Sequence, residues 1–156
     1  MSVFISHRHS DNNIAYKISF ELKRYKVDST IIDIDEEISD AEITKIILNM
    51  VNKCTHLIAI ISDNTEGSWW VPFEIGVATQ GEKRITSFDI SSITLPGYLT
   101  NWPIITNYDE LKHFANKCFQ DNTFLRENIF DERIASARIQ TAAEFHRSLK
   151  ADLGQK

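Results

Sequence analysis

Short apolar runs alternate along the chain with longer segments in which apolar residues recur at helical spacing. The apolar runs at residues 1–6 and 56–62, and a segment rich in β-branched residues at 29–34, predict buried strands. The run at 56–62 is apolar at nearly every position, which is typical of a central parallel strand covered on both faces. Two shorter strands are expected at 84–90 and 104–106.

Amphipathic helices are predicted between these strands. A polar turn at residues 7–11 ends in residues that are favoured as helix caps. The helix after it carries apolar residues spaced by four, four and three positions: Ile14, Ile18, Leu22 and Tyr25. Ser39 and Glu42 have capping-box spacing and predict the start of a second helix. The apolar stripe of that helix consists of Ile43, Ile46, Ile47, Met50, Val51 and Cys54. Further helices are expected at roughly 70–80 and 108–119.

This alternation of strands and helices predicts the fold class. Strands separated by helices form parallel sheets through βαβ crossovers, with helices covering both faces. The 156 residues are enough for one domain, and a hydrophobic content of 42% can supply its core. We therefore expect an α/β fold, a flavodoxin-like sandwich with about five parallel strands.

The last part of the chain predicts one more helix of about twenty residues. Its repeating positions are Ala135, Ile139, Ala142, His146, Leu149 and Leu153. Such a helix needs an apolar partner surface, and we expect it to pack on the domain's own sheet or helices, with self-association as the alternative. We divide the chain into a domain at 1–120, with a core that is complete on its own, and a C-terminal helical extension at 121–156.

Charge and cysteine content narrow the class of protein. Acidic residues outnumber basic ones by 22 to 17, with the signs interspersed, which does not fit a nucleic-acid-binding surface. The longest apolar stretch is far shorter than the roughly 18 residues of a membrane span, and no signal peptide is visible. Cys54 and Cys118 lack C-x-x-C spacing, so we expect buried free thiols in a reducing compartment. These features predict a soluble cytoplasmic protein.

Several familiar catalytic motifs are absent from the sequence. Neither G-x-G-x-x-G nor G-x-x-x-x-G-K-[ST] occurs, which excludes the common dinucleotide and P-loop fingerprints, and no G-x-S-x-G elbow supports a serine nucleophile. Ser6-His7-Arg8 stands where a magnesium-dependent receiver domain would carry acidic residues. His7 and His9 lack a partner cluster with metal-ligand spacing, so we expect no metal.

Ligands of open parallel sheets bind at the carboxyl ends of the strands, so the loops after Ile5, Ile34 and Ile61 are the places to look for chemistry. The third loop opens the helix that carries Trp70 and Glu74. By residue type alone, this glutamate would most often be solvated and this tryptophan part of a core or an interface. Their spacing of four, however, places them on one helical face, where an aromatic wall and a carboxylate can share a cleft.

Two motifs in this order resemble the TIR domain family, the Toll/interleukin-1 receptor fold, and specifically its small stand-alone bacterial members. The first is Val3-Phe4-Ile5-Ser6-His7 with Ser10-Asp11 after it. The second is Ser62-x-Asn64-x-x-x-Ser68-x-Trp70-x-x-x-Glu74. The resemblance covers about residues 1–120 and implies the flavodoxin-like arrangement that the alternation also predicts.

The resemblance implies cleavage of the nicotinamide–ribose bond of NAD, with Glu74 in the place of the family's catalytic glutamate. NAD would be the substrate, and no further cofactor is implied. The residues implied or expected to contact the substrate are Ser6, His7, Arg8, Asp35, Ser62, Asn64, Ser68 and Trp70. Pro72 lacks a backbone donor and should lie in the first turn of its helix, which would bring Glu74 near the helix N-terminus, where the dipole favours the ionised carboxylate.

The resemblance also implies partners. In stand-alone members it suggests a cyclic or conjugated ADP-ribose product that activates a separate effector, as in Thoeris-type antiphage defence, and it implies contacts with other TIR protomers. Residues 35–39 contain neither Gly nor Pro, unlike the corresponding loop of many relatives, so the usual contacts of that loop are not assigned. Two alternatives stay open: a TIR scaffold without chemistry, and an enzyme like the nucleoside deoxyribosyltransferases.

Overall fold

The computed structural model describes residues 3–32, 40–65, 70–127 and 134–156. The strands are β1 Val3–Ser6, β2 Ser29–Ile31, β3 His56–Ile61, β4 Arg84–Asp89 and β5 Ile104–Ile105. The helices are α1 Asn12–Arg24, α2 Asp40–Lys53, α3 Trp70–Gln80, α4 Leu111–Glu127 and α5 Ile134–Asp152. The predicted α/β fold with a five-stranded parallel sheet is confirmed.

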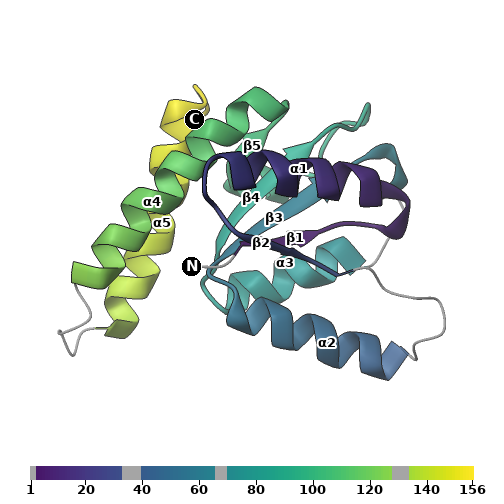
Figure 1. The fold of residues 1–156 in the computed structure, drawn as a ribbon, viewed down its shortest axis with the longest axis horizontal. Coiled ribbons are helices and arrows are strands. Elements are labelled where there is room, and N and C mark those ends of the chain that lie inside the picture. Colours follow the sequence, from purple (N-terminus) through teal and green to yellow (C-terminus); the bar gives the residue numbers. More distant parts are fainter. Residues whose placement is uncertain (1–2, 33–39, 66–69, 128–133) are drawn as a thin grey trace.

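The strands lie in the order β2-β1-β3-β4-β5, and every pair is parallel (Figure 1). Helices α1, α4 and α5 pack on one face, and α2 and α3 pack on the other. Because the connection from β2 to β3 passes β1, the winding direction of the chain reverses between β1 and β3. In sheets of this order, that reversal is where ligands bind, at the carboxyl ends of the two strands.

Each strand contributes to both faces of the core, because successive side chains of a strand point to opposite sides. In β1, Val3 and Ile5 pack with α1, α4 and α5, whereas Phe4 packs with α2 and α3. In β3 all six residues are buried, and this strand lies at the centre of the sheet. The apolar run at 56–62 therefore correctly predicted a central strand of the sheet.

The structure corrects several details. Tyr25 follows the last residue of α1 and is partly exposed, and Ile46 is 37% exposed although it belongs to the predicted stripe of α2. A stripe six residues wide covers more of the helix circumference than one sheet face can bury, so Ile46 at its margin stays in solvent. The capping box at Ser39 and the end of the segment at 29–34 lie outside the described residues.

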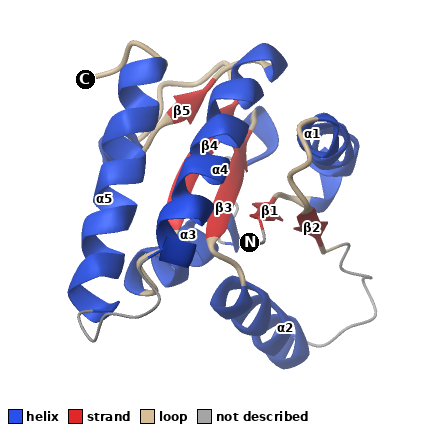
Figure 2. Cartoon of the chain, turned by 60° about the vertical axis from the view of Figure 1, so that its left-hand side comes forward, coloured by secondary structure: helices blue, strands red, loops and turns tan. Residues whose placement is uncertain are grey.

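The C-terminal helix is part of the core. Helix α5 lies beside α4 (Figure 2) and contributes Phe145 and Leu149 to the apolar cluster on the α1 side of the sheet. Strand β5 is too short to reach Ile85, so the backbone N–H of Ile85 donates instead to Nε2 of His146, at 2.8 Å. The expectation that the core is complete without this helix is therefore wrong.

The C-terminal tail also reaches the outer edge of the sheet. The side-chain amide of Gln155 accepts a hydrogen bond from the backbone N–H of Ile104 at 3.0 Å and donates to the carbonyl of the same residue. Lys150 donates to the carbonyl of Thr100 at 2.7 Å. These contacts fix the end of the chain against β5. Among the described helices, none combines the length and apolar character that a bilayer crossing requires.

Candidate active site

The candidate catalytic and substrate-binding side chains lie near the carboxyl ends of β1 and β3. Ser6 is the last residue of β1, and Ser62 follows the last residue of β3. Val71 and Ile75 anchor α3 on the sheet through the apolar cluster of that face. Glu74 lies between them in sequence, in the second turn of the helix. The loops predicted to carry the site and the helix with the carboxylate thus meet at the point where the winding reverses.

Glu74 and Ser6 form the centre of this site. The Glu74 side chain is 5% exposed and Ser6 is also buried, and the Ser6 hydroxyl donates a hydrogen bond to Oε2 of Glu74. Glu74 is therefore not the solvated carboxylate that its residue type suggests. Within the described parts of the chain, the Ser6 hydroxyl is the hydrogen-bond partner of this carboxyl, whose second oxygen has acceptor capacity for a bound molecule.

Burial controls the ionisation of Glu74. It raises the pKa of this carboxyl from 4.5 to about 7, and the hydrogen bond from Ser6 opposes the rise only in part. Pro72 lies in the first turn of α3 as expected, but the expected preference for the ionised form is wrong. Removal of water from the carboxyl outweighs the helix dipole, whose effect fades within the first turn.

Asp11 organises the neighbouring loops. It is 1% exposed, and its two oxygens accept hydrogen bonds from different residues: Oδ2 from the Ser62 hydroxyl at 2.7 Å and Oδ1 from the Asn64 side-chain amide at 2.8 Å. The backbone N–H of Asn64 donates in turn to the Ser62 hydroxyl at 3.1 Å. The sequence predicted a helix cap at this position, but the Asp11 carboxyl makes no capping hydrogen bond to α1.

His7 and Arg8 lie on the first loop beside this network. His7 donates from Nε2 to Oδ1 of Asn12, which orients its ring over the start of α1. The exposed side chain of Arg8 donates to the backbone carbonyl of Asn64 and so reaches across from the first loop to the third. The structure therefore brings five of the predicted residues to one edge of the sheet together with Glu74; these are Ser6, His7, Arg8, Ser62 and Asn64.

The remaining predicted residues cannot be placed. Asp35 and Ser68 lie outside the described residues, and although Trp70 begins α3, its side chain is not described. Sequence reasoning missed Asp11 as part of the site. The sequence did place Asp11 in a loop that follows a buried strand, which is where ligands of parallel sheets bind. Ser10-Asp11 also fits the start of a helix, however, and no local pattern predicts the hydrogen bonds of Asp11 with Ser62 and Asn64.

Neither cysteine offers an alternative nucleophile. Cys54 and Cys118 are buried free thiols, as expected. Burial raises the pKa of Cys54 to about 11 and raises the pKa of Cys118 as well, so both thiols stay protonated at neutral pH.

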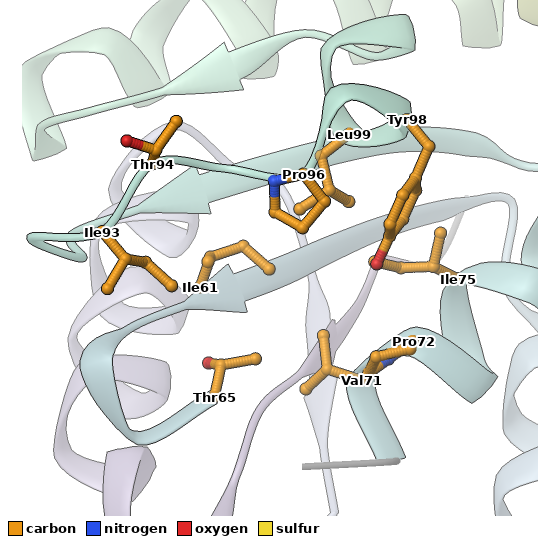
Figure 3. A pocket seen from close by; sticks show the side chains of 10 residues that line it. All are labelled: Ile61, Thr65, Val71, Pro72, Ile75, Ile93, Thr94, Pro96, Tyr98 and Leu99. Atoms are coloured by element: carbon orange, nitrogen blue, oxygen red, sulfur yellow. The ribbon is translucent and has the colours of Figure 1, made fainter. Parts of the chain in front are cut away.

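An apolar pocket lies on the other side of α3, between this helix and the loop after β4 (Figure 3). Its volume is about 360 Å³. The lining residues are Ile61, Thr65, Val71, Pro72, Ile75, Ile93, Thr94, Pro96, Tyr98 and Leu99. Glu74 is not among them. Helix α3 therefore presents a carboxyl group towards β1 and an apolar wall towards the pocket.

The chain is similar to several solved structures. One similar structure is a 2-deoxyribosyltransferase from the psychrotolerant bacterium Bacillus psychrosaccharolyticus, with a TM-score of 0.58 and 12% identity over 72% of this chain and 90% of that chain. At this identity the likeness concerns the fold alone. Another is a diflavin flavoprotein A3 from Nostoc sp., with a TM-score of 0.44 and 11% identity over 97% of this chain and 94% of that chain.

The comparison with protein families is decisive for the classification. A search of curated proteins found no match. The model of the TIR domain, in contrast, matches residues 3–113, which include β1 to β5, the Asp11 network and Glu74. The match extends over well more than half of the chain, and this protein accordingly belongs to the TIR domain family.

Proposed function

We propose that this protein cleaves the nicotinamide–ribose bond of NAD and that Glu74 is the catalytic carboxylate. The observation that carries the proposal is the buried Glu74 side chain, hydrogen-bonded to Ser6 at the reversal point of the sheet. Membership of the TIR domain family, which includes enzymes of this kind, supports it. A carboxyl group whose pKa is raised to about 7 by burial is typical of a functional group and unusual for a structural one.

The chemistry needs a well-placed negative charge. When the bond breaks, its electron pair leaves with nicotinamide, which becomes neutral, and the positive charge passes to the ribose as an oxocarbenium ion. A carboxylate held in a water-poor site stabilises that cation far more than the same group in water would. In the proposal, Glu74 supplies this charge, or accepts a hydrogen bond from a ribose hydroxyl, while Ser6 holds its orientation.

Substrate binding would also set the ionisation of Glu74. The nicotinamide ring of NAD is a pyridinium cation, and an opposite charge within a few ångströms lowers the pKa of a carboxyl group. Binding would therefore convert a group that is about half protonated near pH 7 into the carboxylate that bond cleavage needs. The ionised form would then be present in the complex, where it acts.

The other residues of the site are assigned supporting roles in the proposal. Arg8, which is exposed, would contact the pyrophosphate, and a guanidinium is well suited to that group. His7, Ser62 and Asn64 would contact ribose oxygens. Ser68 and Trp70 are proposed contacts on the strength of the family motif, and Asp35 because of its place in the loop that follows the second strand.

The product is proposed to be a signal. Attack by water gives ADP-ribose and a proton, whereas exclusion of water allows an internal or added nucleophile to give a cyclic or conjugated ADP-ribose. We propose attack by an internal or added nucleophile, which gives a cyclic or conjugated ADP-ribose that activates a separate effector in antiphage defence. A scaffold without chemistry would gain nothing from a buried carboxyl, which lowers stability when it ionises.

Mass spectrometry of NAD incubated with the protein tests the proposal. Wild type should release nicotinamide and Glu74→Ala should not, while Glu144→Gln, which alters an exposed glutamate of α5, should match wild type. A hydrolysed and a cyclised product differ in mass by one water. No release by wild type at high protein concentration, or full activity of Glu74→Ala, would contradict the proposal. Base release from 2′-deoxynucleosides in place of NAD would favour the deoxyribosyltransferase alternative.

A further inference from the structure

The apolar pocket beside α3 has the character of a ring-binding site. Ile61 at the end of β3 forms its floor, Val71 and Ile75 form one wall, and the loop that carries Tyr98 forms the other (Figure 3). Ligand pockets of proteins have volumes of about 300–1,000 Å³ and are mostly apolar with a few polar groups. At about 360 Å³ this pocket is near the lower end, which fits one ring system and little more.

The chemistry of the walls favours a flat heteroaromatic group. Pro72 and Pro96 offer flat aliphatic surfaces, and the ring of Tyr98 extends from the loop towards α3 (Figure 3). Thr94 and Tyr98 add hydroxyl groups that suit ring nitrogens and an exocyclic amino group. The described lining residues are apolar or carry a hydroxyl group, which suits an uncharged ring.

The position of Glu74 decides which ring this is. Residues of a helix are rotated by about 100° from one to the next, so Glu74 is about 160° from Pro72 and about 100° from Ile75 around the helix. Val71, the third residue of α3 that lines the pocket, lies between the two directions. Glu74 contacts Ser6 and does not line the pocket. A ring whose bond to ribose is broken beside Glu74 therefore cannot occupy the pocket on the other side of the helix.

We propose that this pocket binds the adenine base of the dinucleotide, so that NAD spans the beginning of α3 with its two bases on opposite sides of the helix. The inference rests on the proposed function, since it takes NAD as the substrate. It assigns recognition of the substrate to Tyr98 and Thr94, which lie outside the family motif, and leaves bond cleavage to Glu74 and Ser6.

Kinetics with two substrates test this assignment, because nicotinamide mononucleotide has the scissile bond but lacks adenosine. Tyr98→Ala removes one wall, and Thr94→Trp fills the pocket. Each should reduce the preference for NAD over nicotinamide mononucleotide, measured as the ratio of their kcat/KM values, by about tenfold, as expected for loss of one stacked base. The matched control is Tyr16→Ala, since Tyr16 is a tyrosine of α1 with 55% exposure against 48% for Tyr98. The control should keep the wild-type ratio.

A binding measurement separates this inference from the proposed function. AMP carries the adenine without the nicotinamide, and saturation-transfer NMR should detect its adenine protons against wild type but not against Thr94→Trp. An unchanged ratio of kcat/KM values would overturn the inference, even if both values fell by the same factor. Equal AMP signals with wild type and Thr94→Trp would also overturn it. If wild type cleaves neither substrate, the proposed function fails, and the AMP measurement still decides whether the pocket binds adenine.

Discussion

The hydroxyl of Ser6 donates to the carboxyl of Glu74, which joins the end of β1 to the second turn of α3 inside the protein. Neither side chain has appreciable access to solvent, although both would be more stable in water than in this environment without a partner. Burial of Glu74 therefore weakens the fold when this carboxyl ionises, at the place where the chemistry is proposed. That trade between stability and function leads to the first two predictions.

Replacement of Glu74 by Gln should abolish the activity and preserve the fold. Glutamine keeps an acceptor for the Ser6 hydroxyl but carries no charge, so the stabilisation of the ribose cation is lost. Nicotinamide release should fall by at least about 100-fold, the size of effect seen when one electrostatic group of an active site is removed. Chromatographic detection of nicotinamide measures the rate, and circular dichroism checks the fold. A well-folded Glu74→Gln protein with a rate near wild type would remove Glu74 from the mechanism.

The same variant should be more stable than wild type above neutral pH. The pKa of Glu74 is near 4.5 in the unfolded chain and about 7 in the folded protein, so the folded state binds the proton more tightly. The contribution of this group to stability is therefore present at low pH and is lost as pH rises from about 4.5 to 7. The loss amounts to about 3 kcal/mol at 1.4 kcal/mol for each pKa unit.

Urea unfolding of both proteins from pH 4.5 to 8 measures this effect. The difference in free energy of unfolding between Glu74→Gln and wild type should grow with pH and level off above about 7. The difference between the two proteins is used because other groups, including His146, also titrate in this range and contribute equally to both. A difference that does not vary with pH would show that Glu74 ionises as freely in the folded protein as in the unfolded chain.

His146 should make the protein sensitive to acid. Burial first, with Arg84 and Lys150 as further causes, lowers its pKa from 6.5 to about 4, and its neutral Nε2 accepts the hydrogen bond from Ile85. The unfolded chain takes up a proton below pH 6.5 while the folded protein does not. The stability that this histidine contributes is therefore lost as pH falls from 6.5 towards 4, by up to about 3 kcal/mol.

His146→Gln tests that prediction, because glutamine can still accept from Ile85 but cannot take up a proton. The variant should lose less stability than wild type between pH 6.5 and 4 in urea unfolding. His113→Gln, at a partly exposed position of α4, is the control and should follow the wild-type curve. Parallel curves for wild type and His146→Gln would contradict the assigned role.

Asp11 should be important for stability because two loops depend on it. Asp11→Ala removes the acceptor for both Ser62 and Asn64, and it leaves the buried Ser62 hydroxyl without that partner. The free energy of unfolding should fall by about 2–4 kcal/mol. Ser62→Ala keeps the bond from Asn64 to Asp11 but removes the one from Ser62 and the acceptor of the Asn64 backbone N–H, so it should lower the free energy by less, about 1–2 kcal/mol. Thermal and urea unfolding measure both. Equal effects of the two substitutions would mean that Asp11 does not hold the loops together.

The sequence predicted the layers of this fold better than its long-range polar contacts. Apolar periodicity depends on neighbours along the chain, which is why the order of elements and the central place of 56–62 were predicted correctly. The contact of Asp11 with Ser62 joins positions 51 residues apart, and no local pattern contains it. The burial of Glu74 is of the same kind, since the residues that exclude water from it come from other parts of the chain.

The last helix illustrates the remaining failure. Its spacing of apolar positions was recognised, but Phe145 was not among them, although this side chain lies in the core with Phe114. A repeat that fits several helical faces does not specify which of them is buried, and only the shape of the facing surface selects one. The same limit explains why Ile46, in a similar stripe, is exposed.

The amide of Gln155 occupies the backbone donor and acceptor of Ile104 as a neighbouring strand would. Exposed strand edges invite pairing with other chains, and proteins commonly protect them. At Ile104 that protection is one side chain, and it depends on the C-terminal tail staying in place. Addition of a further strand at this edge would require displacement of Gln155, so release of the C-terminal tail and exposure of the Ile104 backbone are one event.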